Sequence, residues 1–258
     1  MEEKIHLMGI INLTPDSFYS ASRSQDAEAA IKRAGALLEE GADVLDFGAC
    51  STRPGSKGIG ADQEWQRLKP ALEAVRRAFP DAQISVDSYW SEVVRETYDL
   101  IGPFMVNDIS AGALDREMLP TVGELRLPYI AMHMRGTPET MQSLTDYDGD
   151  IVEAVKEYFE VFADKADKAG IKEWILDPGF GFAKTREQNW ELLEKLSELN
   201  CFGKEILVGL SRKSMFGVRP EDALEATLIA QRKAYEQGAR WFRVHDVVAA
   251  RRSLYSSI

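Results

Sequence analysis

The sequence predicts an α/β protein, a (β/α)8 TIM barrel formed by a single domain over residues 1–258. Three observations predict it. Short apolar segments alternate with amphipathic helical segments along the whole chain, with no low-complexity segment or linker between them. The apolar segments are nearly continuous, which indicates strands buried on both faces of a parallel sheet. Eight such units in ~250 residues match the number of units and the size of a closed barrel.

The first half of the chain contains four of the expected strand–helix units. The first strand covers residues 5–11, an almost wholly apolar run. The helix after it covers 26–40, because apolar residues recur there at the helical period: Ala30, Ile31, Ala34, Leu37 and Leu38. Apolar runs then predict strands at 43–48, 83–87 and 104–108, and amphipathic patterns predict helices at 62–79, 91–100 and 115–126.

The second half contains the other four units. Strands are expected at 129–134, 174–177, 205–210 and 241–245, and helices at 149–169, 186–199, 221–237 and 247–256. The strand at 174–177 must stop near Asp177, because Pro178 lacks the N–H that a central strand needs. Gly179 and Gly181 follow, and glycine lets a ligand approach the backbone closely. We therefore expect the Asp177 carboxylate to face a pocket; a surface Asp-Pro turn is the alternative.

A doubly wound open sheet is the alternative fold. Its nucleotide-binding version requires a Gly-x-Gly-x-x-Gly turn after the first strand. Here the first strand is followed by Asn12-Leu13-Thr14-Pro15-Asp16, so the closed barrel is preferred.

Composition restricts the classes of function. With 45% hydrophobic and 28% charged residues the chain is typical of globular proteins, and no apolar run approaches the length of a membrane-spanning helix. The start, Met1-Glu2-Glu3-Lys4, lacks the basic region of a signal peptide, and two cysteines give no disulfide framework, so we expect a cytoplasmic protein. A net charge of −11 argues against non-specific nucleic-acid binding.

Polar residues stand at the end of every expected strand, where a barrel builds its active site. In chain order they are Asn12, Asp46, Asp87, Asn107-Asp108, His133, Asp177, Ser211-Arg212-Lys213 and Arg243-Val244-His245-Asp246. Each has a simpler explanation when taken alone, such as a helix cap, a turn, a core histidine or a surface ion pair. A barrel weakens these explanations jointly, because it brings all the strand ends to one mouth.

The side chains at this mouth suit two kinds of ligand group. Asp87, Asn107 and Asp177 can bind a flat heterocycle through its adjacent N–H donors, and Lys213 can bind a ring carbonyl or nitrogen. The other side is cationic and suits phosphate groups, through Arg53, Arg212, Arg243 and His245. Asn12 and Asp16 can supply oxygen ligands to Mg²⁺, which fills its remaining positions with phosphate oxygens and water. These residue types suggest a heterocycle that carries a diphosphate leaving group. No nucleophile–base pair stands out, and a leaving group that departs with electrostatic help needs no protein nucleophile.

Eight motifs occur in a characteristic order along the chain. They are Gly9–Phe18, Ser51–Gly55, Ser85–Asp87, Asn107–Ser110, Met132–Met134, Asp177–Phe182, Gly209–Ser214 and Arg243–Val247. Together they make the chain resemble the dihydropteroate synthase family of pterin-binding barrel enzymes over essentially its full length. The resemblance implies a transferase of folate biosynthesis that joins 4-aminobenzoate to 6-hydroxymethyl-7,8-dihydropterin diphosphate in an SN1-like reaction, giving 7,8-dihydropteroate and diphosphate. It also implies Mg²⁺, a homodimer and inhibition by sulfonamides.

The resemblance also assigns roles to individual residues. Substrate-binding roles fall on Thr52, Asp87, Asn107, Met132, Asp177, Phe182, Ser211, Lys213, Arg243 and His245. The pterin ring would be held by Asp87, Asn107, Asp177 and Lys213, and the aminobenzoate would lie near Ser211 and Lys213. Asn12 would bind Mg²⁺ on the diphosphate. The catalytic set would be Arg53, Lys213, Arg243 and His245.

Two positions depart from the family pattern. Ser20 stands where many members carry an acidic residue in the first loop, and Cys50 stands where many carry a glutamate. Two other functions remain open. A methyltetrahydrofolate:corrinoid methyltransferase shares the pterin recognition but does not need the cationic diphosphate side. A non-catalytic pterin-binding paralogue is favoured by the altered loop and opposed by the intact Asn12, Lys213, Arg243 and His245.

Overall fold

The sheet of the computed structural model is a closed barrel of eight parallel strands, paired in the order β1 to β8. The structure describes residues 4–13, 23–51, 55 and 58–255. The strands are β1 His6–Asn12, β2 Val44–Gly48, β3 Gln83–Asp87, β4 Met105–Asp108, β5 Tyr129–Met132, β6 Trp174–Asp177, β7 Ile206–Val208 and β8 Ala239–Val244. Closure is made by β1 and β8, where Met8 lies opposite Arg243. The predicted fold class is confirmed.

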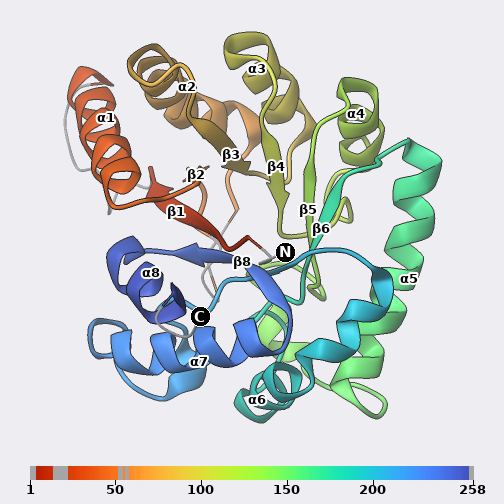
Figure 1. Cartoon of the computed structure of the whole chain (residues 1–258). Coiled ribbons are helices and arrows are strands. Elements are labelled where there is room, and N and C mark those ends of the chain that lie inside the picture. Colours follow the sequence, from red (N-terminus) through yellow and green to blue (C-terminus); the bar gives the residue numbers. More distant parts are fainter. Residues whose placement is uncertain (1–3, 14–22, 52–54, 56–57, 256–258) are drawn as a thin grey trace.

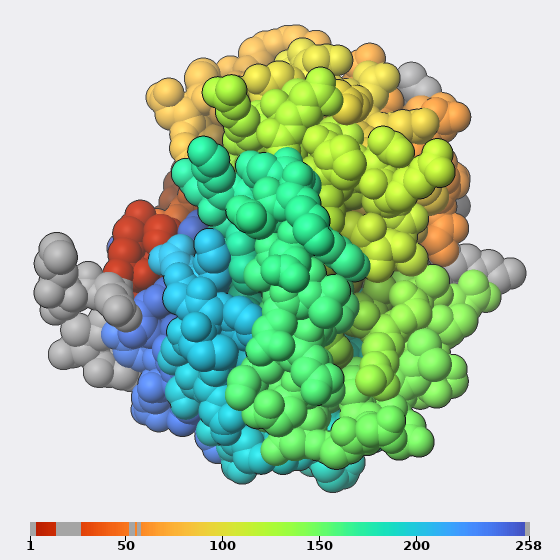
Figure 2. Space-filling model, turned by 90° about the vertical axis from the view of Figure 1, so that its right-hand side faces the viewer, coloured from red at the N-terminus to blue at the C-terminus, as the bar shows by residue number. Residues whose placement is uncertain are grey.

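Helices surround the barrel as an outer ring (Figure 1). They are α1 Arg23–Glu39, α2 Ala61–Ala78, α3 Ser91–Ile101, α4 Met118–Leu125, α5 Ile151–Ala169, α6 Arg186–Glu194, α7 Leu224–Glu236 and α8 Val247–Tyr255. Figure 2 shows this ring from the side, with α5 running across the front of the molecule. Among the helices that the structure describes, none is long and apolar enough to cross a membrane.

The bounds of several predicted elements differ from the observed ones. The helices expected at 26–40 and 115–126 begin at Arg23 and Met118, the strand expected at 241–245 covers Ala239–Val244, and four others differ as follows. The strand expected at 129–134 ends at Met132, and the strand expected at 205–210 covers only Ile206–Val208. The pairing of that short strand with β8 shifts register between Ile206 and Leu207. The helix expected at 186–199 ends at Glu194 and tightens into the 3₁₀ helix η2, Leu196–Phe202. The helix expected at 221–237 begins at Leu224, because Pro220–Asp222 forms a separate 3₁₀ turn.

The barrel interior changes from apolar to polar toward the carboxyl ends of the strands. One apolar cluster fills the part of the barrel interior nearer the amino-terminal ends of the strands. It consists of Met8, Val44, Met105, Ile130, Ile175, Leu207 and Trp241. Residues two positions apart on a strand share a face. Two positions further along, the same strands carry Ile10, Asp46, Asn107, Met132, Asp177 and Arg243. The alternation of the strands therefore places a polar layer directly above an apolar floor.

The outer faces of the strands pack against the helices in a second, larger core. Phe47 of β2, Phe159 of α5 and Leu68 of α2 are all fully buried in it. Burying a side chain of this size stabilises the fold by about 1.5–3 kcal/mol. This core holds the strands in place and so fixes the positions of the polar layer.

A buried network of hydrogen bonds around Asp108 stabilises the turn after β4. The carboxylate of Asp108 accepts hydrogen bonds from the hydroxyl of Tyr129 at 2.6 Å, the N–H and hydroxyl of Ser110 at 2.7 Å each, and the N–H of Gly112 at 2.8 Å. Asp108 and Tyr129 are both fully buried. The turn interpretation thus holds for Asp108, whereas its neighbour Asn107 faces the barrel interior and bonds to Asp46.

We expect Tyr129→Phe to lower the free energy of unfolding by about 1–3 kcal/mol, because the buried Asp108 carboxylate loses one of its donors. Urea unfolding measures the change. Tyr255→Phe is the matched control, because that tyrosine is exposed. Equal stabilities of the two variants would contradict the structural role of this hydrogen bond.

Candidate active site

Arg243 of β8 links two carboxylates that lie on β2 and β3, two strands that pair with each other but not with β8. Its Nε donates to Asp46 at 2.6 Å, and its Nη2 donates to Asp87 at 2.9 Å. Asp46 is wholly buried and also accepts from the side-chain amide of Asn107 at 3.3 Å. Four strands, β2, β3, β4 and β8, thereby share one polar network. The network fixes the direction in which the guanidinium and both pterin-ring candidates, Asp87 and Asn107, face the mouth.

Three charged groups of the mouth have pKa values shifted toward neutrality. Burial raises the pKa of Asp87 to about 7, although the Arg243 guanidinium opposes the rise. Burial likewise raises the pKa of Asp177 to about 6, opposed by the Gly179 N–H and by Lys213. Burial lowers the pKa of Lys213 to about 8, opposed by Asp177. Such shifts toward neutrality are characteristic of functional sites.

A cluster of buried apolar side chains lies beside the carboxylates of Asp87 and Asp177. Met132 and Phe182 belong to one buried cluster, with Tyr89, Ile109, Met134, Met141 and Ala183. The ammonium of Lys213 lies over the Phe182 ring, 4.5 Å from its centroid, in a cation–π contact. Gly181, whose φ of 81° favours glycine, lies beside this lysine, and an added Cβ would lie 3.3 Å from Lys213 Cδ. A planar ring with an apolar face and N–H groups on its edge fits this combination.

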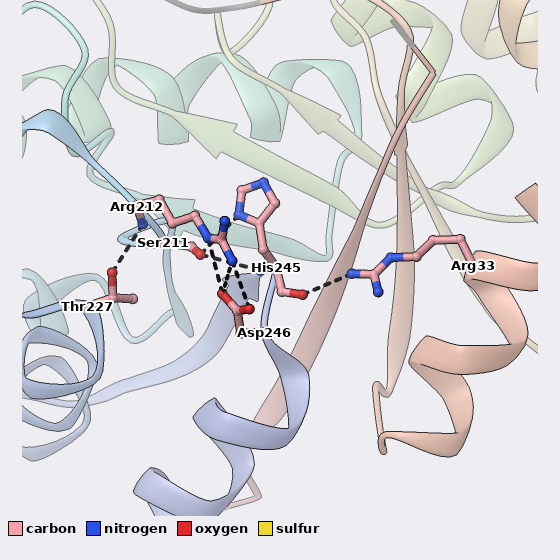
Figure 3. A network of polar contacts seen from close by, with 6 residues as sticks. All are labelled: Arg33, Ser211, Arg212, Thr227, His245 and Asp246. Atoms are coloured by element: carbon pink, nitrogen blue, oxygen red, sulfur yellow. Dashed lines mark hydrogen bonds and ion pairs between the residues drawn. The ribbon is translucent and has the colours of Figure 1, made fainter. Parts of the chain in front are cut away.

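His245 lies just past β8 and pairs with Ser211, its Nδ1 lying 3.0 Å from the serine hydroxyl. Its backbone carbonyl accepts from Arg33 of α1 at 2.9 Å (Figure 3). Burial, and then Arg243 and Arg212, lower the pKa of His245 to about 4. The imidazole is therefore neutral at pH 7, contrary to the cationic role expected from the sequence. A phosphate beside it would raise the pKa and restore the charge.

Arg212 is not a free cation of the mouth. It forms an ion pair with Asp246, with Nη2–Oδ1 at 2.9 Å and Nε–Oδ2 at 3.2 Å, and its backbone N–H donates to Thr227 at 3.1 Å (Figure 3). The expectation that it contributes charge to a phosphate is therefore weakened, and its surface-pair interpretation is supported. Its φ of 58° is unusual for a non-glycine residue, and these bonds hold it there.

The remaining expected site residues differ in what can be said of them. Asn12 ends β1, half-buried, and the register runs from it through Gly48 to Asp87. Thr52, Arg53, Asp16 and Ser20 lie outside the described residues. Within the described ranges no group of three His, Cys, Asp or Glu side chains gathers that could hold a metal ion. One amide oxygen at the mouth fits Mg²⁺, which takes few protein ligands when phosphate is present.

Cys50 does not have the environment of a nucleophile. Burial raises the pKa of its thiol, and the sulfur lies 3.9 Å from the Tyr89 hydroxyl. A cysteine reacts as its thiolate, which this environment disfavours. The departure from the family pattern at this position therefore leaves a neutral group beside the mouth.

The sequence did not identify two residues of the mouth. Asp46 stands at a strand end, and its alternation with Val44 indicates that it lies on the interior face. Lys184 carried no signal at all. It is buried after β6, and its ammonium contacts His133 and two loop carbonyls.

A separate cavity of about 330 Å³ opens at the amino-terminal ends of the strands, at the opposite end of the barrel. Stacked His6 and Trp241 line part of it, with ring centroids 4.2 Å apart. Its charged members, Lys4 and Asp43, already pair with each other at 3.5 Å. No convergent set of acceptors and cations occurs among its lining residues, so we place the active site at the carboxyl ends.

The fold and the polar mouth define a barrel enzyme that binds a flat heterocycle, and comparison with known proteins agrees. The family described as pterin binding enzyme matches residues 8–245. The chain therefore belongs to the pterin-binding enzyme family.

The relatives are more specific. The chain is 39% identical over 254 residues to the dihydropteroate synthase of Synechocystis sp., covering 96% of this chain and 87% of that protein. Its structure is similar to a dihydropteroate synthase of Clostridium difficile solved in the presence of pteroic acid, with a TM-score of 0.91, 34% identity, and coverage of 99% and 96%. The dihydropteroate synthase of Xanthomonas albilineans with 4-aminobenzoic acid has a TM-score of 0.89, 35% identity, and coverage of 99% and 92%. The predicted resemblance is confirmed.

We expect Asp46→Asn to reduce kcat/KM by tenfold or more, because it removes the shortest ion pair of Arg243 and frees the guanidinium to reorient. A hydrogen bond to a charged group typically contributes about 1.5–3 kcal/mol of free energy, which is lost when the charge is removed. Steady-state kinetics measure the change in kcat/KM, and urea unfolding measures any change in the free energy of unfolding. Asp164→Asn on the exposed face of α5 is the control. An Asp46→Asn variant with wild-type kinetics would refute the orienting role of Asp46.

Proposed function

We propose that this chain is a transferase of folate biosynthesis with dihydropteroate synthase activity. Its substrates would be 6-hydroxymethyl-7,8-dihydropterin diphosphate and 4-aminobenzoate. The observation that carries the proposal is the convergence of Asp87, Asn107, Asp177 and Lys213 beside Arg243 and His245, in a chain similar over nearly its full length to dihydropteroate synthases.

Pterin recognition would use the acceptors of the polar layer. Ionised Asp177 accepts the adjacent amino and ring N–H groups in a two-pronged bond, and Asp87 with Asn107 binds the opposite edge of the ring. Lys213 donates to a ring carbonyl or nitrogen. Met132 and Phe182 cover the apolar faces of the ring.

The diphosphate would lie on the cationic side of the mouth. Arg243 reaches it from β8, and the His245–Ser211 pair offers further hydrogen bonds. Thr52 and Arg53 are proposed to approach from the second loop. Mg²⁺, proposed as the cofactor, would be held by the amide oxygen of Asn12 and would supply positive charge to the phosphate oxygens.

The reaction would break the C–O bond between the pterin methylene and the diphosphate, whose oxygen keeps the electron pair. The amine nitrogen of 4-aminobenzoate then bonds to the methylene carbon and loses a proton. In an SN1-like reaction the protein stabilises charge and supplies no nucleophile. The environment of Cys50, whose thiol pKa is raised by burial, agrees with this. Arg243 and Lys213 would stabilise the developing negative charge.

The two alternatives fit less well. A methyltetrahydrofolate:corrinoid methyltransferase would not need Arg243 fixed by two carboxylates toward a leaving group. A non-catalytic pterin-binding paralogue keeps pterin affinity but releases no diphosphate. We further propose a single domain, a homodimer and a cytoplasmic location for the active protein.

The deciding experiment measures diphosphate release by the purified protein with dihydropterin diphosphate and Mg²⁺, with and without 4-aminobenzoate. Release that rises with aminobenzoate and yields dihydropteroate is the expected result.

In Lys213→Ala both turnover and pterin affinity should fall, by tenfold or more, because a charged hydrogen bond contributes about 1.5–3 kcal/mol. Lys165→Ala on the exposed face of α5 is the control. Unchanged activity in Lys213→Ala would overturn the assignment.

Removal of Mg²⁺ by a chelator should abolish diphosphate release but leave binding of a pterin without phosphate groups nearly unchanged. The reason is that the metal contacts the leaving group and not the ring. Isothermal calorimetry with the free pterin, and the release assay with and without chelator, separate the two effects. Equal loss of both would place the metal at the pterin ring.

A further inference from the structure

Lys184 is a buried amine whose surroundings offer a complete set of hydrogen-bond acceptors to its ammonium form. Its Nζ lies 2.8 Å from His133 Nδ1, 3.0 Å from the carbonyl oxygen of Gly179 and 3.1 Å from that of Phe182. Only 4% of the residue is exposed. An ammonium has three donors and no acceptor, so these three contacts satisfy it fully. They require an unprotonated Nδ1, and burial followed by the Lys184 charge holds the pKa of His133 well below its usual value.

This cation is tied to the loop that presents Asp177. The N–H of Gly179 donates to Asp177 Oδ1 at 2.8 Å, while the carbonyl of the same glycine accepts from Lys184. The backbone N–H of His133 donates to the Asp177 carbonyl at 2.9 Å. A Cβ at Gly179 would collide with the His133 carbonyl, so the loop is packed tightly against β5. Lys184 therefore bridges β5 and the β6 loop directly behind Asp177.

The charged groups around Lys184 and Asp177 come from several elements. The charges of Asp177 on β6, Lys213 after β7 and Arg135 after β5 all act on the Lys184 ammonium. Burial lowers the pKa of Lys184 to about 7, and Asp177 opposes that shift. In return Lys184 is among the groups that hold down the pKa of Asp177, after the Gly179 N–H and Lys213 and before Arg243. The two residues thus stabilise each other's charged form.

We propose that Lys184 is a positioning residue that keeps Asp177 ionised as the pH falls and so extends pterin binding to mildly acidic conditions. The inference rests on the proposed function, because it takes Asp177 as the acceptor of the pterin N–H groups. Lys184 touches no substrate in this arrangement. It acts through the charge of Asp177 and through the loop carbonyls.

The sign of the effect follows from the charge that is removed. Replacing Lys184 by methionine deletes a positive charge near Asp177, so protonation of that carboxyl becomes easier and its titration moves to higher pH. A shift of about one pH unit, typical for one nearby charge, would weaken pterin binding about fivefold at pH 6 and less than twofold at pH 8.5. A purely structural role for Lys184 would weaken binding equally at every pH.

The test measures pteroic acid binding by calorimetry between pH 5.5 and 8.5 for the wild type, Lys184→Met, Lys184→Gln and the control Lys172→Met. Lys172 is exposed before β6, away from the mouth. Glutamine restores hydrogen bonds to the loop carbonyls but not the charge, so Lys184→Gln should show the same pH-dependent defect as Lys184→Met. A parallel loss at all pH values, or rescue by glutamine, overturns the proposal. Failure of the wild type to bind would instead refute the proposed function.

A measurement on the wild type decides the matter even if both variants fail to fold. With ¹³C-labelled lysine, the Lys184 Cε resonance should show an inflection at the pH where the Asp177 carboxyl titrates, because each charge feels the other. The exposed Lys172 resonance should show none there. A Lys184 resonance without that inflection overturns the coupling.

Discussion

The ion pairs of Arg243 are the interaction on which the mouth of the barrel depends. One guanidinium, 23% exposed, contacts the fully buried Asp46 and the nearly buried Asp87. Burying such charges costs several kcal/mol for each ion, and only good geometry with additional hydrogen bonds offsets that cost. Asn107 supplies one of these bonds to Asp46. The arrangement is therefore stable only when β2, β3, β4 and β8 are closed in register, so the site exists only in the closed barrel.

The two layers of the barrel interior divide stability from chemistry. The lower layer is apolar and contributes the burial of large side chains such as Ile130, Ile175 and Leu207. The upper layer carries the carboxylates, the amide and the guanidinium. The polar groups of the upper layer bond to one another above this apolar floor, so their positions are fixed before a ligand binds. This preorganisation is what electrostatic stabilisation of a departing diphosphate requires.

The loop after β6 is held by hydrogen bonds to several surrounding side chains. Lys184, Asn189 and Tyr147 all bond to its backbone: the Tyr147 hydroxyl donates to the Ala183 carbonyl at 2.8 Å, and Gly181 N–H donates to Asn189 at 2.7 Å. A loop with its polar groups satisfied in this way is rigid without being buried in a strand. It carries Asp177 at one end and Phe182 at the other, so one rigid segment fixes both an acceptor and an apolar face of the proposed pterin site.

Sequence periodicity determined the barrel, the number of strands and the mouth at which polar residues gather, because alternation and helical period are local properties of the chain. Pro178 determined the end of β6 in the same local way. The register shift between β7 and β8 depends on both strands, so the sequence pattern of β7 alone does not predict it. Likewise, the pairing of Arg212 with Asp246, the neutrality of His245, the role of Asp46 and the bonding of Lys184 depend on groups distant in sequence. Their pKa values and partners arise from burial and from charges that only the closed tertiary structure brings together.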